Sequence, residues 1–399
     1  MIRISRLAVA VFALAGAVAC EQVDAPLLAV TPDPMIAKVE AGLLPRVWVS
    51  SEPAKTGSLA ERMAFYNVPG VSIAVIKDGR ISWAKGYGVL EAGKSQPVDP
   101  HTIFQAGSIS KPTAAIAALR MVEQGKLQLD APINSELKSW KLPDNEFTKG
   151  APVTLRGILS HGAGLTVHGF PGYEAGAPVP TVPQVLDGEA PANTPMVRVD
   201  KTPGASWRYS GGGYTIMQLA MTDVSGTSFP TLTDMLVLKP ARMTRSSYVN
   251  PLPEANRVNA ATAHHRDGTT VPGHSHTYPE MAAAGLWTTP SDLSRLALSV
   301  VASARGDKGA LLGPEITRQM LTTQIGSYGL GFELAEPGDG QVFAHGGSDE
   351  GFEAFLFAYT DGHGGAAIMT NGQNGGRLAQ EIMVSLSNTY GWKYGAAIK

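Results

Sequence analysis

The sequence has a single cysteine, Cys20, so no disulfide bond can form within the chain. Charged residues are also scarce: they make up 17% of the 399 residues, and the formal net charge is −2. Because there is no basic block, we expect no nucleic-acid partner. The hydrophobic share of 44% argues against disorder and predicts a large core, in one large domain or two.

The apolar N-terminus is not long enough to span a membrane. Arg3 and Arg6 precede Leu7–Ala19, which is almost wholly apolar but too short to cross a bilayer. With small residues just before Cys20, residues 1–19 are typical of a secretory signal peptide.

The place of Cys20 resembles the lipidation site of bacterial lipoprotein signals, in which the cysteine becomes the new N-terminus. This resemblance implies an exported, periplasmic protein, lipid-anchored to the outer membrane through Cys20 and without other membrane contact. Such signals usually carry leucine where this chain has Ala17. Ordinary cleavage that leaves a free Cys20 therefore stays open as the alternative.

Residues 20–58 are proline-rich with one short helical patch, and we expect a tether and N-terminal segment there. The folded domain is expected over residues 59–399. Strands at both of its ends, with helices between them, predict an α/β (α+β) fold. In this fold an antiparallel β-sheet is flanked by helices, and a helical subdomain lies beside it across a cleft. The expected strands are 70–77, 80–87, 341–344, 352–360 and 366–370, and the expected helices are 114–123, 154–159, 213–224, 290–301, 314–320 and 377–390.

The strongest candidate for chemistry is Ser108-x-x-Lys111, just before the expected helix over 114–123. A spacing of three places both side chains on one face of a first helical turn. The unpaired N–H groups and the positive end of the helix dipole point there, which favours an oxyanion and disfavours an ammonium. A buried Lys111 could therefore serve as the base for a Ser108 nucleophile.

The spacing alone is weak evidence, because it occurs twice more in the chain. Ser82 and Lys85 fall in an alternating, strand-like run, where this spacing puts the two side chains on opposite faces. Ser135 and Lys138 lie in a polar stretch with no apolar helix to bury the lysine. We interpret both pairs as solvated surface residues.

Two later stretches could complete a site around Ser108. In Tyr209-Ser-Gly-Gly-Gly-Tyr214, a tyrosine on a glycine-rich turn before a helix could relay protons. In His345-Gly-Gly-Ser348, at the end of an expected strand, the Ser348 N–H could join that of Ser108 in an oxyanion hole. The alternatives are a half-buried tyrosine with a satisfied hydroxyl and a glycine-rich hairpin turn.

Taken in this order, Ser108-x-x-Lys111, Tyr209-Ser-Gly211 and His345-Gly-Gly347 resemble the three motifs of serine β-lactamases and penicillin-binding proteins. The chain is most similar to class C β-lactamase-like serine hydrolases, which include family VIII esterases and D-alanyl-D-alanine carboxypeptidases. Two further segments, 159–165 and 282–293, resemble recurrent parts of that group, and the likeness covers about residues 59–392.

The resemblance implies a role for each matched residue. Ser108 would be the nucleophile, Lys111 the base or its partner, and Tyr209 the proton relay. The backbone N–H groups of Ser108 and Ser348 would form the oxyanion hole. The implied substrate-binding residues are His345, Gly346, Gly347 and Gly211.

The chain departs from the family pattern at two places. Gly211 replaces an amide side chain that helps to orient the substrate and the lysine. His345-Gly346 replaces a lysine and a threonine, which removes a permanent cation and a hydroxyl that would hold a substrate carboxylate. Both departures put β-lactamase activity in doubt, while neither removes the nucleophile.

Other motifs are weaker. His264-His265 and His274-Ser-His276 could be metal ligands, but no cysteine and no H-E-x-x-H helix accompanies them, so we interpret them as a polar loop and expect no metal or other cofactor. His161, before a glycine in a turn, is interpreted as a structural hydrogen-bonding residue. No G-x-S-x-G is present, which excludes the α/β-hydrolase nucleophile turn.

Three functional classes follow. The first is a hydrolase that forms an acyl-enzyme with esters or small amides. The second is a β-lactamase or D-alanyl-D-alanine carboxypeptidase. The third is a binding or sensor domain that is acylated without turnover. In all three the partner is a small molecule: an ester, an amide or a β-lactam.

Overall fold

A computed structural model describes residues 33–45 and 55–396. Its central element is a six-stranded sheet in which every pair of neighbouring strands is antiparallel. Its strand order is β2-β1-β8-β7-β6-β5, so the N-terminal hairpin pairs with the last strand, as predicted. The bounds are β1 Gly70–Lys77, β2 Arg80–Gly88, β5 Glu333–Ala335, β6 Val342–Asp349, β7 Phe352–Tyr359 and β8 Gly364–Thr370, and a separate pair is formed by β3 Phe104–Gln105 and β4 Trp287–Thr288.

The hairpin closes on Asp78 and Gly79, whose φ angles are 51° and 72°. Two successive residues with positive φ match the right-handed twist of the flanking strands, and asparagine or aspartate followed by glycine is the pair that adopts this turn most readily. The predicted hairpin is confirmed. Every residue of β1 except Lys77 is buried, because β1 pairs on both sides and helices cover both faces of the sheet.

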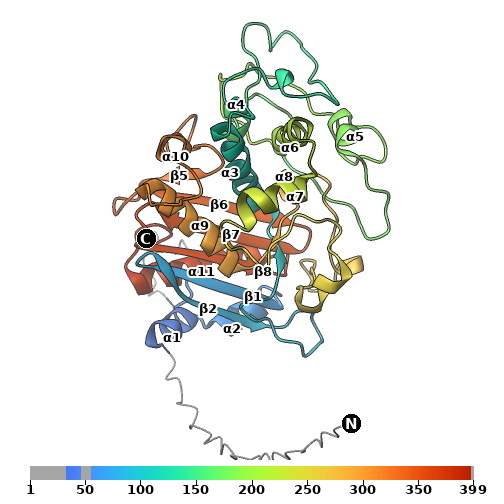
Figure 1. Cartoon of the computed structure of the whole chain (residues 1–399). Helices are drawn as coiled ribbons and strands as arrows, with labels where there is room; N and C mark the ends of the chain where they lie inside the picture. The colour runs from blue at the N-terminus through green and yellow to red at the C-terminus, as the bar shows by residue number, and fades with distance from the viewer. Residues whose placement is uncertain (1–32, 46–54, 397–399) are drawn as a thin grey trace, which may run out of the picture.

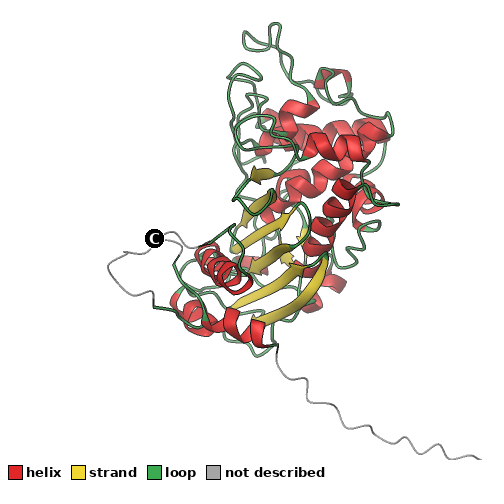
Figure 2. Cartoon of the chain, turned by 90° about the vertical axis from the view of Figure 1, so that its left-hand side faces the viewer, coloured by secondary structure: helices red, strands yellow, loops and turns green. Residues whose placement is uncertain are grey.

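Helices cover the sheet on both faces (Figures 1 and 2). On one face α11 (Gly375–Tyr390) contributes Leu378, Ile382 and Leu386 to a core shared with Ile73 of β1. On the other face lies α9 (Pro290–Arg305), whose apolar side joins a second, larger core.

The larger core continues into a helical subdomain, which lies above the sheet in Figure 1. Long loops connect its helices, and the predicted helical subdomain is thus present. Its helices are α3 Ser110–Glu123, α4 Leu155–Leu159, α5 Val182–Asp187, α6 Gly211–Ser225, α7 Phe229–Thr233 and α8 Met281–Ala284, and the remaining helices are α1 Pro34–Ala41, α2 Leu59–Phe65 and α10 Pro314–Met320.

The short helical patch expected within residues 20–58 is present as α1, and it packs against the folded body. Val39 of α1 is buried, and its carbonyl oxygen accepts a hydrogen bond from Ser385 Oγ of α11 at 2.7 Å. Apolar side chains on one side of this short helix can be buried against α11, so it joins the folded body. The predicted signal segment and Cys20 lie outside the described residues.

Two element boundaries differ from the prediction in ways that concern the site. Helix α3 begins at Ser110 instead of 114, because Pro112 is tolerated in a first helical turn, where its missing N–H has no partner to lose. Strand β6 continues to Asp349 instead of ending at Ala344, because it pairs with β7 over its whole length.

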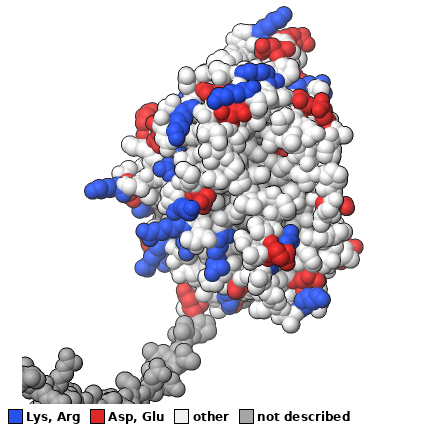
Figure 3. Space-filling view, turned by 45° about the vertical axis from the view of Figure 1, so that its right-hand side comes forward, with Lys and Arg blue, Asp and Glu red and all other residues white. Residues whose placement is uncertain are grey.

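The surface is sparsely charged. On the face shown in Figure 3, most of the surface carries neither basic nor acidic side chains, in keeping with the 17% of charged residues. Within residues 33–45 and 55–396, no helix combines the length and the hydropathy needed to cross a membrane.

Candidate active site

Ser108 lies in a single 3-10 turn, Gly107–Ile109, that runs directly into α3. Strand β6 packs closely against this turn. A Cβ atom at Gly107 would lie 2.4 Å from the Ser348 nitrogen, and one at Gly347 would lie 1.9 Å from the Ala106 oxygen. Both positions therefore require glycine, since only bare backbone lets the two segments approach so closely.

Lys111 is buried beside Ser108. Its Nζ atom lies 2.9 Å from Ser108 Oγ and 2.9 Å from the carbonyl oxygen of Ala283 in α8. The predicted proximity of the two side chains is confirmed, and the lysine is held between the serine and a backbone carbonyl. In this geometry a proton can pass between the amine and the hydroxyl.

The Tyr209 ring lies beside Lys111, and its role as a proton relay stays a prediction. The Lys111 Nζ atom lies 4.8 Å from the centroid of the Tyr209 ring. The next residue, Ser210, starts α6: its Oγ accepts from the N–H of Gly213 at 3.0 Å and donates to the Thr166 oxygen at 2.7 Å. The cap fixes the backbone that carries Tyr209.

The two competing S-x-x-K pairs have no such setting. Ser82 and Lys85 lie on β2, where the lysine is paired with Glu40. The Ser135 Oγ atom donates to the Pro132 carbonyl at the surface. Neither pair contacts Tyr209 or the end of β6 in the described part of the chain, so Ser108 and Lys111 are the pair with a site around them.

The segment His345–Ser348 lies within β6, not at its end or in a turn. Strand β5 pairs with β6 only as far as Ala344, so beyond that residue the edge of β6 faces the Ser108 turn. A Cβ atom at Gly347 would lie 3.2 Å from the Ser108 nitrogen. The backbones of Ser108 and Ser348 are thus neighbours, as an oxyanion hole requires, and that role stays a prediction.

His345 is buried, and its two ring nitrogens have different surroundings. Its Nδ1 atom lies 2.6 Å from the Gly346 oxygen and must donate to it, which leaves Nε2 as an acceptor with no partner among the described residues. Burial, and then the positive charge of Lys111, lowers the pKa of His345 to about 3. The ring is therefore neutral at pH 7.

Gly211, which was predicted to bind substrate, packs against a loop of the protein. Its N–H donates to the His168 oxygen at 3.0 Å, and a Cβ atom there would lie 3.0 Å from Phe170 Cε2. The loop at residues 168–170 thus fills the space beside Gly211. The side chain that reaches the site from this loop is His168, whose ring centroid lies 4.8 Å from that of Tyr209.

His161 is hydrogen-bonded as predicted, and it also belongs to the site. Its Nδ1 atom accepts from the Ser210 N–H at 3.1 Å, and its ring packs on Tyr209 with the centroids 4.2 Å apart. Burial first, and Lys111 second, hold the pKa of His161 well below its ordinary value. The nearby tyrosine and histidines are too far apart in sequence for any local pattern to have placed His161 here.

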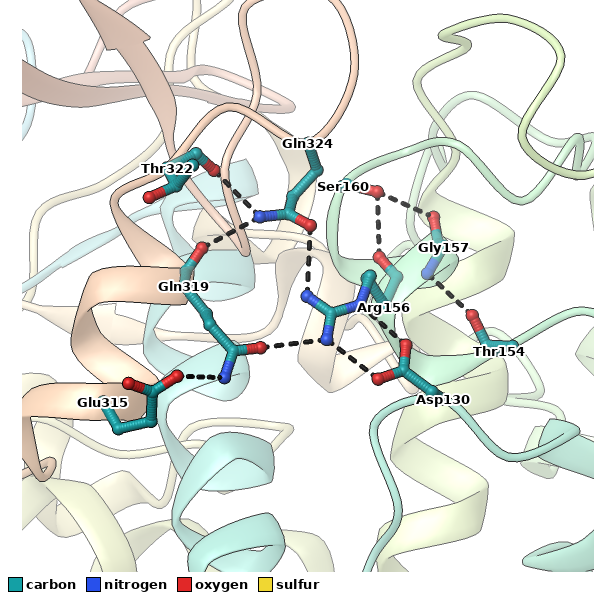
Figure 4. A network of polar contacts seen from close by, with 9 residues as sticks. All are labelled: Asp130, Thr154, Arg156, Gly157, Ser160, Glu315, Gln319, Thr322 and Gln324. Atoms are coloured by element: carbon teal, nitrogen blue, oxygen red, sulfur yellow. Dashed lines mark hydrogen bonds and ion pairs between the residues drawn. The ribbon is translucent and has the colours of Figure 1, made fainter.

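Sequence reasoning also missed an aromatic wall formed by Trp207 and Tyr328. Their ring centroids lie 5.5 Å apart, and Tyr328 also contacts His345. A network around Arg156 of α4 holds the segment that leads to Tyr328 (Figure 4). The acceptors of the Arg156 guanidinium are Asp130, Gln319 and Gln324, at 2.6, 2.9 and 3.1 Å.

Two buried carboxyl groups near the nucleophile turn were not predicted either. Asp349 shares one face of β6 with His345 and Gly347, and Glu280 directly precedes α8. None of their four carboxyl oxygens has a hydrogen-bond partner in the part of the chain that the structure describes. Burial raises the pKa of Glu280 to about 8 and that of Asp349 well above its ordinary value.

The histidines considered as metal ligands are used in other ways. His264 Nδ1 lies 2.7 Å from the Asn371 oxygen, and its Nε2 accepts from the Ala92 N–H at 3.0 Å. His265 pairs with Glu350, and His276 bonds the Pro171 oxygen. Among the described residues there is no group of three or more His, Cys, Asp or Glu placed to hold a metal ion.

Comparison with known proteins agrees with this geometry. The Beta-lactamase family model matches residues 57–384. The chain is 24% identical to the PbpX protein of Bacillus subtilis strain 168 over 77% of this chain and 71% of that protein. It is 26% identical to the esterase EstB of Burkholderia gladioli over 56% of this chain and 58% of that protein.

Solved structures show the same fold. The octameric penicillin-binding protein homologue from Pyrococcus abyssi superposes with a TM-score of 0.66 at 24% identity, covering 84% of this chain and 76% of that one. The penicillin-binding protein from Bacillus halodurans gives 0.63 at 21% identity, covering 83% and 98%. The family match spans most of the chain, and with the fold it supports one conclusion: the protein is a hydrolase that belongs to the beta-lactamase family.

Proposed function

We propose that this protein is a serine hydrolase that forms an acyl-enzyme on Ser108 and acts on neutral esters or small amides. The observation that supports the proposal most is the buried contact of 2.9 Å between Lys111 Nζ and Ser108 Oγ, with the Tyr209 ring alongside. A nucleophile within hydrogen-bond reach of a buried base is the arrangement that covalent catalysis needs.

The acylation step follows from these contacts. The Lys111 side chain acts as the base and takes the proton from Ser108 Oγ as the oxygen attacks the carbonyl carbon of the ester. The N–H groups of Ser108 and Ser348 bind the oxyanion, a contribution of roughly 3 kcal/mol each in the transition state. The proton reaches the leaving oxygen through Tyr209, the C–O bond breaks, and the alcohol departs.

Deacylation reverses these proton movements. A water molecule gives a proton to the same Lys111–Tyr209 pair and attacks the acyl carbon, and Ser108 leaves with its hydrogen restored. The carboxylic acid is the second product. No group outside the chain is needed for the balance of atoms or electrons.

The charge of the site favours neutral substrates. His345 is neutral because its pKa lies near 3, and Gly346 has no hydroxyl, so neither can hold a substrate carboxylate as lysine and threonine would. A hydrogen bond to a charged group contributes about 1.5–3 kcal/mol against about 1 kcal/mol for a neutral one. Anionic substrates should therefore lose roughly tenfold to a hundredfold in kcat/KM.

The similarity to EstB supports an esterase, and the similarity to penicillin-binding protein structures keeps β-lactam or D-alanyl peptide hydrolysis as the second candidate. A panel of p-nitrophenyl butyrate, a chromogenic cephalosporin and a D-alanyl-D-alanine peptide separates them. We expect the ester to have the highest kcat/KM. Faster hydrolysis of the cephalosporin would overturn the substrate assignment, and acylation without turnover of any substrate would indicate a sensor.

The nucleophile is tested separately with a fluorophosphonate. The reagent should label Ser108, as read by peptide mass spectrometry, and Ser108→Ala should abolish labelling and turnover. Ser135→Ala is the matched control, because Ser135 has the same S-x-x-K spacing without the site. Labelling at another serine would overturn the mechanism.

A further inference from the structure

A cavity of about 420 Å³ opens beside Tyr209, and the mechanism above makes no use of it. Its walls include Leu165, Val167, His168, Trp207 and Tyr209. Tyr209, which lines the cavity, also lies against Lys111, because the Lys111 Nζ atom is 4.8 Å from the centroid of the Tyr209 ring. Its volume falls in the range of sites that bind small molecules. We refer to it as the Trp207 cavity.

One wall of the cavity is strained and firmly held. Val167 has a φ of 60°, a left-handed conformation that β-branched residues rarely adopt. The first two N–H groups of α6, those of Gly211 and Gly212, donate to the His168 and Val167 oxygens, each at 3.0 Å. This loop thus satisfies the free end of a helix, and the bonds hold the strained conformation in place.

Another part of the wall is an aromatic side chain that remains accessible. Trp207 is 41% exposed, which is unusual for so large an apolar group. It is nevertheless fixed, because its ring packs against Tyr328 and the Gly326 backbone lies against it. A rigid, exposed indole at the edge of a cavity is well suited to cover a flat or extended apolar group.

The polar edge of the cavity is His168, which is exposed at its rim. Burial of part of the ring, and then the charge of Lys111, keep the pKa of His168 below its ordinary value. The cavity lining also includes Arg208, whose guanidinium is paired with Asp200.

We propose that the Trp207 cavity is the subsite for an apolar group of the substrate, an alkyl chain or an aryl ring attached to the ester. This inference rests on the proposed function, and it narrows the substrate class to esters with one bulky apolar side. An apolar group that contacts Val167 and Trp207 in the cavity would leave water while the carbonyl lies at Ser108, which lowers the free energy of the bound transition state.

The experiment compares the wild-type protein with Trp207→Ala in two series of esters. One series varies the acyl chain of p-nitrophenyl esters from acetate to octanoate. The other varies the alcohol of acetate esters from methyl to benzyl and 1-naphthyl. In at least one series, the kcat/KM of the largest member relative to the smallest should fall at least about tenfold in the variant, or about 1.4 kcal/mol. The affected series identifies the side of the ester that the cavity holds.

Two controls make the outcome specific. Phe65→Ala removes an aromatic ring that is 68% exposed on α2, away from the site, and should leave both series unchanged. His168→Trp narrows the cavity from its rim and should lower kcat/KM more for the large substrates than for the small ones, so the proposal stays testable if Trp207→Ala unfolds. Ratios within twofold of wild type in both series, for both cavity variants, would overturn the proposal.

The rate of labelling separates failure of this proposal from failure of the proposed function. A fluorophosphonate reacts when Ser108 Oγ displaces fluoride from phosphorus, so it needs the nucleophile but no turnover. Reagents with an ethyl or a decyl chain should differ in rate in the wild type, and the difference should shrink in Trp207→Ala. A protein that is labelled in this way but hydrolyses no ester would sink the proposed function and leave the subsite standing.

Discussion

Two buried glutamates on opposite sides of the sheet differ in every contact they make. Glu381 of α11 binds Arg62 through two contacts of 2.6 Å and accepts a third hydrogen bond from Tyr66 at 2.7 Å. Glu280, on the side of the helical subdomain, is fully buried and has no partner for either oxygen in the described part of the chain.

The comparison shows where this protein tolerates unpaired polar atoms. A buried polar group without a partner costs about 1–3 kcal/mol. Unpaired buried atoms of His161, His345 and Asp349 lie within the electrostatic reach of Lys111, and others, such as those of Asn250 and Asp339, lie elsewhere in the described part of the chain. Glu381 is satisfied by Arg62 and Tyr66, whereas the groups near Lys111 keep unpaired atoms at the place where chemistry is proposed.

The largest effect on catalysis should come from Lys111, which lies beside Ser108. Lys111→Ala removes the group within 2.9 Å of the nucleophile and should lower kcat by about a hundredfold to ten-thousandfold, the usual range for a general base. The control is Lys85→Ala, which changes the lysine of another S-x-x-K spacing, paired with Glu40 at the surface. Equal losses in the two variants would remove the distinction between the motifs.

The next effect concerns stability on the other side of the sheet. Glu381→Ala leaves the partly buried Arg62 without its partner and should lower the free energy of unfolding by about 2–3 kcal/mol. Urea denaturation measures the change. Because Glu381 lies away from Ser108, kcat per folded molecule should stay within twofold, and a larger change would show that the two sides are coupled.

The positive charge and the hydroxyl of the family pattern can be introduced at His345 and Gly346. His345→Lys with Gly346→Thr should raise the ratio of cephalosporin to ester kcat/KM by roughly tenfold to a hundredfold, because a cation and a hydroxyl then meet a substrate carboxylate. Steady-state kinetics with both substrates give the ratio. An unchanged ratio would mean that β6 does not hold the carboxylate.

Glu280 should make stability depend on pH. Burial raises its pKa to about 8 in the folded protein, above its ordinary value of 4.5. The stabilising protonated form is complete below about pH 4.5 and is lost as the pH rises through 8. Glu280→Gln stays neutral, so it should be more stable than wild type at pH 9, by on the order of 5 kcal/mol, and similar at pH 4.5. Thermal melts across this range measure the difference, and parallel curves would contradict it.

We expect the smallest effect on activity from a change in the N-terminal segment, for which we propose lipidation at Cys20. Cys20→Ala should move the protein from the membrane to the soluble fraction and leave kcat/KM unchanged. Fractionation and the intact mass of the mature protein provide the measurement. An unmodified Cys20 at the mature N-terminus would show that ordinary cleavage is correct.

Local patterns in the sequence were enough to predict the hairpin at Asp78-Gly79, five of the six strands of the sheet and the Ser108–Lys111 pair, but not the short edge strand β5. Each of these features depends on residues that are close together in the chain. The turn depends on two residues, a strand depends on the alternation of apolar and polar residues, and the contact between the two side chains depends on a spacing of three. Tyr209 was identified because it precedes a glycine-rich helix start.

The surroundings of these residues were decided by the tertiary structure alone. The carbonyl that holds Lys111 belongs to Ala283, 172 positions further along the chain. The rings of His161, His168 and Tyr328 reach Tyr209 and His345 from separate loops, and α1 becomes part of the body only by packing on α11. Such contacts arise because burial brings distant segments together, and no local period in the chain encodes which segments will meet.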